Sequence, residues 1–368
     1  MDEDEKYMRR CIQLARNGVM GAAPNPMVGA VIVCDGKIIG EGYHRRCGQA
    51  HAEVNAVRSV TQTELLKRST IYVSLEPCSH YGKTPPCADM LIEKGIPRVV
   101  VGCVDPFSQV SGRGIRKLRD AGVEVRVGVL ERECRNLIRR FITFHSERRP
   151  YIVLKWAQSA DGFIDLERTE GSPVVLSSPE TQMLVHRQRA CCKAILVGRR
   201  TALLDNPSLT VRHWNGENPL RLVIDREGSL PDDLRLFDGS TPTVVFTGQT
   251  TRLHPGTESV TLDFSRDILP QMMDFLYQRN IQSLLVEGGR ELLQSFIDAG
   301  LWDEVFIERT SHILGQGVPA PDMGTSTCFR GIKRFQSDYL HYFRRAEWSV
   351  DEMCRGVDKL GSFIYNFV

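Results

Sequence analysis

A histidine, an acid and two cysteines in the first quarter of the chain have the types and spacing of a metal site. Glu53 follows two residues after His51, and Cys78 and Cys87 lie further along, each preceded by proline. Zinc binds imidazole nitrogen and thiolate sulfur tetrahedrally, and a catalytic zinc keeps one position for water. We expect His51, Cys78 and Cys87 to bind zinc, which lowers the pKa of that water. Glu53 would not bind the metal but would transfer the proton of the water to a leaving group.

The elements expected around these residues bring them together. Helix-forming residues follow His51, so His51 should start a helix, and an acid two residues later can converge with it only in the first turn. Residues 71–75 form an expected buried strand that delivers Cys78 just past its end. Residues 84–86 are expected to open a second helix, with proline just inside its start and Cys87 following. A helix N-terminus favours a thiolate.

A structural zinc site is the alternative interpretation. Such sites are closed by a fourth cysteine or histidine, and His80 or Cys47 could supply it. A histidine with an acid two residues on, followed by Pro-Cys and a second cysteine, is nevertheless the signature of zinc-dependent base deaminases. Eight residues separate Cys78 from Cys87, which departs from the short Cys-x-x-Cys form.

Four segments together resemble one family. Residues 24–29 (Pro-Asn-Pro-Met-Val-Gly), 40–44, 51–53 and 76–87 are similar to the bifunctional deaminase and reductase of riboflavin biosynthesis. The resemblance implies an α/β chain with a cytidine-deaminase-like three-layer α/β/α domain, residues 1–147, and a dihydrofolate-reductase-like α/β domain, residues 148–368. The implied substrate is a diaminopyrimidinone ribosylamino 5′-phosphate, which loses an amine before its ribose is reduced to ribityl. Asn25, His44 and Asp105 would contact it in the deaminase domain.

Bulk composition fits this interpretation. A chain of 368 residues favours two domains, and a net charge of +2 gives no electrostatic footprint for nucleic acid. The 11 cysteines are too sparse for a disulfide scaffold and fit a reducing cytoplasm. The acidic start is not a secretory signal, and no segment reaches membrane-spanning length. We expect a cytoplasmic enzyme with a small-molecule substrate and neither membrane nor nucleic acid as partner. The sequence leaves open whether the enzyme forms a homo-oligomer.

Alternating strands and helices continue after a polar stretch at residues 145–150, which is a fair domain boundary. Residues 201–212 are expected to form a loop, and residues 334–368 carry no usable pattern. The expected strands are 28–33, 37–39, 71–75, 98–104, 123–129, 151–159, 194–198, 220–225, 243–247, 260–264, 283–287 and 305–307. The expected helices include 7–15, 130–144, 179–189, 268–279 and 290–299.

A second activity is expected where a strand ends at Glu287 and two glycines open a helix, because backbone N–H groups there can approach an anion. Other segments, including Asp205-Asn206-Pro207 and Lys155 with Asp161-Gly162, also resemble the reductase family. The resemblance implies that NADPH reduces the sugar C1 and that two sets of residues bind the ligands. The cofactor contacts are Thr201, Asp205, Gly289, Arg290, Glu291, Leu292, Leu293, Gln294 and Ser295, and the substrate contacts are Arg189, Leu209, Arg212 and Glu287.

One departure from the family pattern leaves alternatives open. Val175 occupies the place where the family often has tryptophan, and Pro173 the place of a serine. Ser172 or Ser177 could do the polar work instead. One alternative is therefore a deaminase with an inactive reductase half. A nucleic-acid deaminase acting on tRNA is a separate alternative.

Overall fold

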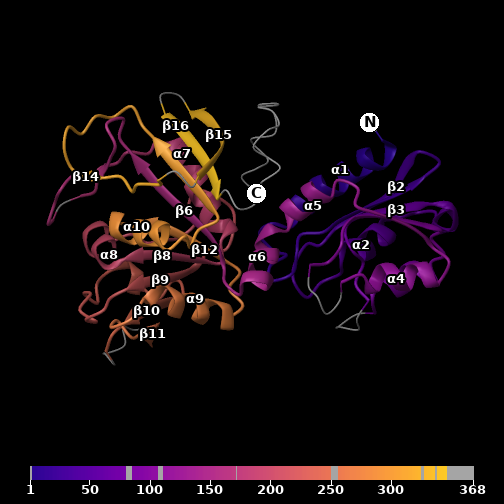
Figure 1. Cartoon of the computed structure of the whole chain (residues 1–368), viewed down its shortest axis with the longest axis horizontal. Helices are drawn as coiled ribbons and strands as arrows, with labels where there is room; N and C mark the ends of the chain where they lie inside the picture. Colours follow the sequence, from indigo (N-terminus) through magenta and orange to yellow (C-terminus); the bar gives the residue numbers. More distant parts are fainter. Residues whose placement is uncertain are drawn as a thin grey trace. The chain divides into compact units, whose positions relative to one another are not determined.

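The computed structural model divides the chain into two compact units, Met1–Arg148 and Arg149–Val368, each considered by itself (Figure 1). Residues 2–79, 85–106, 111–170, 172–249, 256–324, 327–335 and 338–345 are described. Among them, no helix combines the length and hydropathy needed to cross a membrane.

The first unit is built on a five-stranded sheet in the order β2-β1-β3-β4-β5. Strand β1 pairs antiparallel with β2 and β3, whereas β3, β4 and β5 are parallel. The β1–β2 hairpin turns at Asp35 and Gly36, whose positive φ angles of 51° and 69° suit the tight turn predicted there. The strands are Gly29–Cys34, Lys37–Tyr43, Thr70–Leu75, Arg98–Cys103 and Glu124–Val127.

Helices cover both faces of this sheet because its strands alternate apolar side chains between two cores. Val31, Tyr72 and Val100 face one core, which contains α1 (Glu3–Ala15), α5 (Glu131–Leu137) and α6 (Arg139–Glu147). Ile32, Ile71 and Val99 face the other, which contains α2 (Ala52–Ser59), α3 (Cys87–Glu93) and α4 (Arg113–Asp120). The expected three-layer α/β/α fold is confirmed. Short 3-10 helices span Arg16–Gly18 and Thr63–Arg68.

Helix α2 packs directly on the backbone of strand β2 at Gly40 and Gly42. A Cβ atom at Gly42 would lie 2.5 Å from the carbonyl oxygen of Ala52, and one at Gly40 would lie 2.6 Å from that of Ala56. The absence of side chains at these two positions therefore fixes how closely α2 approaches the sheet.

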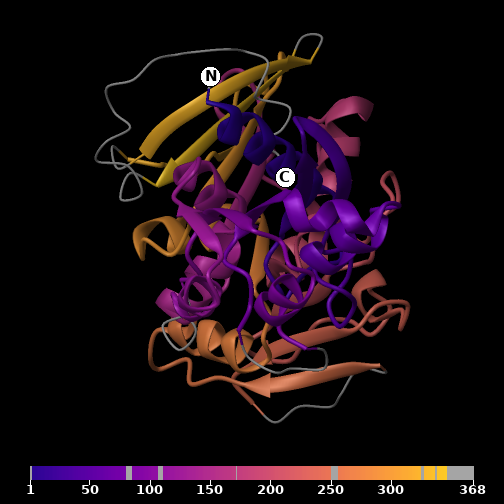
Figure 2. The ribbon, with the colours of Figure 1, turned by 90° about the vertical axis from the view of Figure 1, so that its right-hand side faces the viewer.

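The second unit contains a nine-stranded sheet in the order β11-β10-β9-β8-β12-β6-β13-β16-β15. The strands from β11 to β13 are parallel, and β16 and β15 add an antiparallel hairpin, drawn in yellow in Figure 2. A separate two-stranded sheet pairs β7 with β14. The strands are β6 (Tyr151–Gln158), β7 (Phe163–Asp165), β8 (Ala194–Gly198), β9 (Leu220–Ile224), β10 (Thr243–Thr247), β11 (Thr257–Thr261), β12 (Ser283–Gly288), β13 (Glu304–Arg309), β14 (Val318–Pro319), β15 (Thr327–Phe335) and β16 (Asp338–Arg345).

Four helices pack on the two faces of the large sheet. Helices α9 (Ile268–Gln278) and α10 (Arg290–Asp298) belong to one core, and α7 (Pro179–Cys191) and α8 (Arg199–Asp205) contribute to the other. A 3-10 turn spans Arg235–Phe237. Ser178 caps α7 as predicted, since its side chain accepts the backbone N–H of Thr181 at 3.3 Å.

Four local predictions were wrong. The expected loop at 201–212 begins as helix α8, because Ala202, Leu203 and Leu204 are good helix formers. Strand β11 ends at Thr261, since Leu262 and Phe264 pack against the core after the strand rather than within it. The helix expected at 130–144 is two helices, and Pro86 precedes α3 instead of lying inside it. Residues 334–335 and 338–345 of the patternless tail belong to the edge strands β15 and β16; the rest of the tail lies outside the described part.

Candidate active sites

The three expected metal ligands converge at one point in the first unit. His51 caps the N-terminus of α2, Cys78 follows β3 and Cys87 starts α3. His51 Nδ1 lies 3.5 Å from Cys78 Sγ and 3.4 Å from Cys87 Sγ, and the ligand atoms all lie within 4.8 Å of one another. Tetrahedral zinc, bonded at about 2.3 Å to sulfur and about 2.0–2.1 Å to nitrogen, places such atoms about 3.5 Å apart. The donor set therefore fits zinc in type and in spacing.

The surroundings favour the thiolate at Cys78. Hydrogen bonds from Cys87 and from His51 hold the pKa of Cys78 well below its usual range, and the backbone N–H of Cys87 donates to Cys78 Sγ at 3.3 Å. Cys47, considered as a fourth ligand, is exposed and absent from the cluster found among the described residues. His80 lies outside the described residues.

Glu53 lies in the first turn of α2, beside the ligand cluster. It is buried, and burial followed by the negative charge of Cys78 raises its pKa to about 7. A carboxyl group with such a pKa can accept and return a proton near neutral pH. Its first-turn position explains how an acid two residues from a metal ligand reaches the same site.

Asn25 and His44 meet next to His51. The His44 ring lies edge-to-face with that of His51, with centroids 5.4 Å apart. His44 Nδ1 lies 3.2 Å from the carbonyl oxygen of Ala50, which can only accept, so Nδ1 carries the hydrogen. Burial lowers the pKa of His44, and its neutral Nε2 then accepts from Asn25 Nδ2 at 3.1 Å. Thus His44 orients the Asn25 amide.

Asp105 follows β4, and the carboxylate of Glu76 connects it to the ligand segment. Buried Glu76 accepts the backbone N–H groups of Asp105 at 3.2 Å, Gly112 at 2.9 Å and Gly114 at 2.8 Å. It also accepts that of Ile115 at 3.2 Å. Sequence reasoning had given Glu76 no role of its own, although an acid directly before Pro77-Cys78 was a visible signal.

In the second unit, the turn between β12 and α10 is bonded to Thr201. The Gly289 backbone N–H donates to Thr201 Oγ1 at 2.9 Å, and a Cβ atom at Gly289 would lie 3.2 Å from that oxygen. The next residues, Arg290 and Glu291, form the first turn of α10, where backbone N–H groups and the helix dipole suit a phosphate.

The remaining expected cofactor contacts are differently placed. The side chains of Leu292 and Leu293 lie in the hydrophobic core, so only their backbone can face a ligand. Gln294 accepts the backbone N–H of Asp322 at 2.9 Å, and Ser295 bonds to the carbonyl of Leu292 at 2.8 Å. Helical periodicity thus divides this segment between the core and the ligand side.

Asp205 ends α8 and forms an ion pair with Arg168, which also bonds Asp165 at 2.8 Å. Burial raises the pKa of Asp205, although the pair with Arg168 opposes this. Arg168 was missed by the sequence reasoning, because a lone arginine in a polar stretch carries no pattern.

The expected substrate contacts gather on the face of the sheet covered by α7. Arg189 binds Glu287 through two bonds of 2.9 and 2.6 Å and donates to the carbonyl of Thr210 at 3.2 Å. Burial, the largest single effect, would raise the pKa of Glu287, but the charge and hydrogen bonds of Arg189, together with the charges of Lys155 and His186, lower the pKa overall. Arg212 donates its backbone N–H to His186 Nδ1 at 2.9 Å and its side chain to Thr210 Oγ1 at 2.9 Å.

A second buried acid lies on the other side of β6. Lys155 Nζ is 3.9 Å from Glu308 and lowers the pKa of Glu287, as expected for strands β12, β6 and β13 side by side. Ser177, one of the two serines expected to replace the missing polar group, donates to Glu308 at 2.6 Å. Val175 is 68% exposed, so it does not contribute to the hydrophobic core.

The comparisons with known proteins agree with this two-part organisation. The cytidine and deoxycytidylate deaminase zinc-binding region matches residues 1–103, and the RibD C-terminal domain matches residues 150–340. The chain therefore joins a zinc-dependent deaminase domain to a reductase domain.

Relatives match nearly the whole chain. The riboflavin biosynthesis protein RibD of Aquifex aeolicus is 39% identical over 337 residues, which are 90% of this chain and 93% of that protein. The Escherichia coli protein of that name is 38% identical, covering 85% of this chain and 89% of its own. The crystal structure of a diaminohydroxyphosphoribosylaminopyrimidine deaminase and 5-amino-6-(5-phosphoribosylamino)uracil reductase from Thermotoga maritima has a TM-score of 0.85 and 38% identity, covering 93% of this chain and 99% of that one.

The chain belongs to the family of the riboflavin biosynthesis protein RibD. It is a bifunctional enzyme of riboflavin biosynthesis with deaminase and reductase activities, and its cofactors are Zn²⁺ and NADPH. Its substrates are small pyrimidine compounds. The family, fold class, function and cofactors expected from the sequence are confirmed.

Proposed function

We propose that the first unit deaminates a diaminopyrimidinone carrying a ribosylamino 5′-phosphate and that the second reduces the ribosyl group of the product to ribityl. The observation that carries the proposal is the tetrahedral spacing of His51, Cys78 and Cys87 beside buried Glu53. The deaminase and reductase activities for which the Thermotoga maritima protein is named support the substrate class and the order of the two steps.

In the deaminase half, His51, Cys78 and Cys87 hold the metal, and Glu53 transfers protons. Zinc bound there supplies Lewis-acid activation of water. The Glu53 carboxylate takes a proton from the attacking water and delivers it to the leaving amine nitrogen, so that ammonia departs. Burial of Glu53 and its raised pKa favour both directions of transfer near neutral pH.

Recognition of the pyrimidine falls to Asn25, His44 and Asp105. The Asn25 amide, held by its 3.1 Å contact with His44, offers a donor and an acceptor to the hydrogen-bonding edge of a base. Glu76 anchors the backbone of Asp105. The Asp105 carboxylate therefore lies beyond the carboxyl end of β4, where open α/β sheets bind ligands.

In the reductase half, the cofactor and the phosphorylated sugar occupy neighbouring positions at the carboxyl ends of the parallel strands. NADPH supplies the hydride for the sugar C1. Thr201, Asp205 and the segment Gly289–Ser295 bind the cofactor, with the first turn of α10 facing its phosphates. Arg189, Leu209, Arg212 and Glu287 contact the substrate, and the planar arginine forks suit a phosphate or a sugar oxygen.

The remaining proposals concern the chain as a whole. We place the domain boundary between residues 147 and 148 and propose a cytoplasmic location, supported by the nine free cysteines among the described residues. A small molecule rather than tRNA is the proposed substrate, since the net charge of +2 provides little attraction for RNA.

The test supplies the diaminopyrimidinone phosphate as sole substrate and follows ammonia release and NADPH oxidation together. We expect ammonia first and NADPH loss second, with both absent in Glu53→Gln although metal analysis finds its zinc unchanged. Glu64→Gln, which changes an exposed acid of the same unit, is the control and should behave as wild type.

Three outcomes would contradict parts of the proposal. Ammonia without NADPH loss would favour the alternative of an inactive reductase half. Ammonia release from tRNA at low salt would favour the nucleic-acid deaminase. The absence of both ammonia release and NADPH oxidation with a zinc-loaded protein would refute the proposed substrate.

A further inference from the structure

The loop that follows α8 has an unfavourable backbone conformation at a proposed substrate contact. Leu209 is buried and has a φ angle of +51°, and Asn206 at the end of α8 has a φ angle of +39°. Asparagine tolerates this region, but a leucine there crowds its own Cβ against the backbone. Such a conformation persists only where the surrounding structure imposes it. The residues that impose it can be identified from their contacts.

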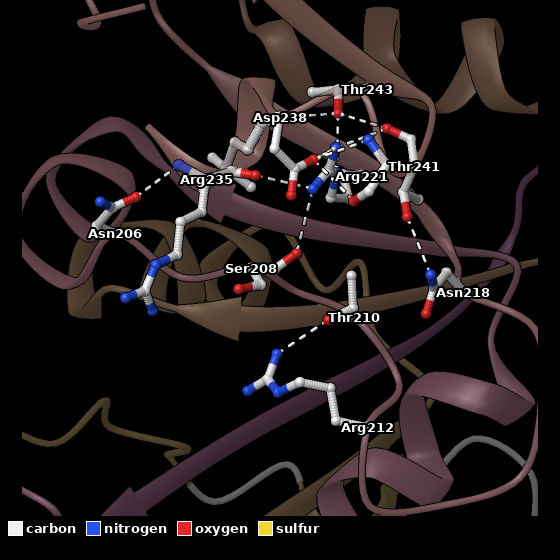
Figure 3. A network of polar contacts seen from close by, with 12 residues as sticks. Asn206, Ser208, Thr210, Arg212, Asn218, Arg221, Arg235, Asp238, Thr241 and Thr243 are labelled. Carbon is white, nitrogen blue, oxygen red and sulfur yellow. Dashed lines mark hydrogen bonds and ion pairs between the residues drawn. The ribbon is translucent and has the colours of Figure 1, made fainter. Parts of the chain in front are cut away.

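Arg221, on strand β9, lies at the centre of these contacts (Figure 3). Its side chain is fully buried, and the contacts use all five of its N–H donors. Nε donates to Thr243 Oγ1 at 2.9 Å, and Nη2 donates to Asp238 Oδ1 at 3.0 Å and to the Thr241 carbonyl at 2.6 Å. These bonds fix the guanidinium plane.

The remaining group, Nη1, reaches the loop. It donates to the carbonyl oxygens of Ser208 at 3.4 Å and Arg235 at 3.0 Å. The backbone N–H of Arg235 in turn donates to Asn206 Oδ1 at 2.7 Å. Ser208 is linked to Arg221 directly, and Asn206 is linked to it through Arg235. The chain entering Leu209 is therefore held at two points, as Figure 3 shows.

The far half of the loop is held by other elements. Asn218 Oδ1 accepts the backbone N–H of Val211 at 2.8 Å, and the Asn218 amide donates to Thr241 Oγ1 at 3.0 Å. The Thr241 carbonyl is one of the acceptors of Arg221. The contacts of Asn218 and Arg221 therefore belong to one connected network, which spans the loop from residue 206 to residue 211.

We propose that Arg221 is a positioning residue of the reductase reaction, which holds the loop 206–212 in the conformation that packs Leu209 into the core and leaves Arg212 exposed to the phosphorylated pyrimidine. This inference rests on the proposed function, which assigns those two residues to the substrate. Arg221 does not touch the substrate; it acts through the backbone of Ser208. Lysine cannot replace it, because an ammonium has three donors at one point and cannot reach acceptors arranged around a planar fork.

The test compares Arg221→Lys with Arg149→Lys in the full-length, zinc-loaded enzyme. Arg149 is also a buried arginine of the second unit and binds Asp303 through two bonds of 2.7 and 2.9 Å. Replacing Arg149 should lower the thermal stability without changing the conformation of the loop 206–212. For Arg221→Lys we expect the KM of the reductase step for the pyrimidine phosphate to rise about tenfold, as for one or two lost hydrogen bonds. The Kd for NADPH, from fluorescence titration, and ammonia release should stay within about twofold of wild type.

Asn218→Ala, at an exposed position, is the second variant and keeps the test decisive if Arg221→Lys does not fold. It should raise the same KM about threefold with little change in melting temperature. Equal KM values in Arg149→Lys and both loop variants, with wild-type NADPH oxidation intact, would overturn the positioning role. Absence of NADPH oxidation in the wild type would instead refute the proposed function itself.

Discussion

Asp4, near the start of the chain, provides a stability prediction that can be worked out from its contacts. Its carboxylate, on α1, has a side chain only 4% exposed and binds one residue from each of three strands. It accepts from the Tyr72 hydroxyl at 2.8 Å, from Arg98 at 3.0 and 2.8 Å and from Arg126 at 2.5 Å. We expect Asp4→Asn to destabilise the first unit, because two arginines would face a neutral amide.

The magnitude follows from the pKa of Asp4. The hydrogen bonds from Arg98, together with those from Tyr72 and Arg126, lower it from 3.8 to about 2 against the effect of burial. At about 1.4 kcal/mol per pKa unit, this difference corresponds to roughly 2 to 3 kcal/mol. Because the folded pKa lies below the unfolded one, this stabilisation is present above about pH 4 and is lost as the pH falls through about 2.

The assay is urea unfolding followed by circular dichroism, with tryptophan fluorescence recorded in parallel because all four tryptophans lie in the second unit. The matched control is Glu41→Gln, which removes an exposed pair with Arg10 at 2.7 Å and should cost less than about 1 kcal/mol. The deficit of Asp4→Asn should shrink between pH 5 and pH 2. A deficit no larger than that of Glu41→Gln, or one independent of pH, would refute the reasoning.

Two further predictions concern the cofactors. Cys78→Ala should lose its zinc and its ammonia release while still oxidising NADPH when the deaminated intermediate is supplied; metal analysis that finds zinc retained would argue against the ligand set. Gly289→Ala should weaken NADPH binding about tenfold, because the new Cβ would lie 3.2 Å from Thr201 Oγ1 at the turn that faces the cofactor. An unchanged Kd in fluorescence titration would exclude that turn as the phosphate site.

The parts of the fold that were predictable are those that bury continuous apolar runs. Residues 98–103 and 243–247 are almost wholly apolar or β-branched, and each forms a parallel strand close to its expected bounds. The metal cluster was predictable because zinc chemistry restricts the residue types so strongly. His51 at a helix start and Cys78 after a strand were placed by the same turn and helix rules.

The parts that were not predictable depend on partners distant in sequence. Arg221 and Thr243 are 22 residues apart, and Arg168 meets Asp205 only after 37 residues. No local pattern specifies such pairs. The bounds of strand β11 differ from the predicted ones for a related reason, since Leu262 packs in the core although it lies after the end of the strand. Local periodicity identifies which residues are buried, but tertiary packing decides which element carries them.

The close packing of α2 on Gly40 and Gly42 has a consequence for engineering. Helix α2, capped by His51, packs against the backbone of Gly40 and Gly42. Its distance from the sheet is therefore set by strand β2 rather than by the metal ligands. Grafting only the three ligands and Glu53 onto another strand–helix scaffold would raise the helix by the width of a methyl group. Because a misplacement of about 1 Å can lower a rate about a hundredfold, a working transplant must carry the two glycines with it.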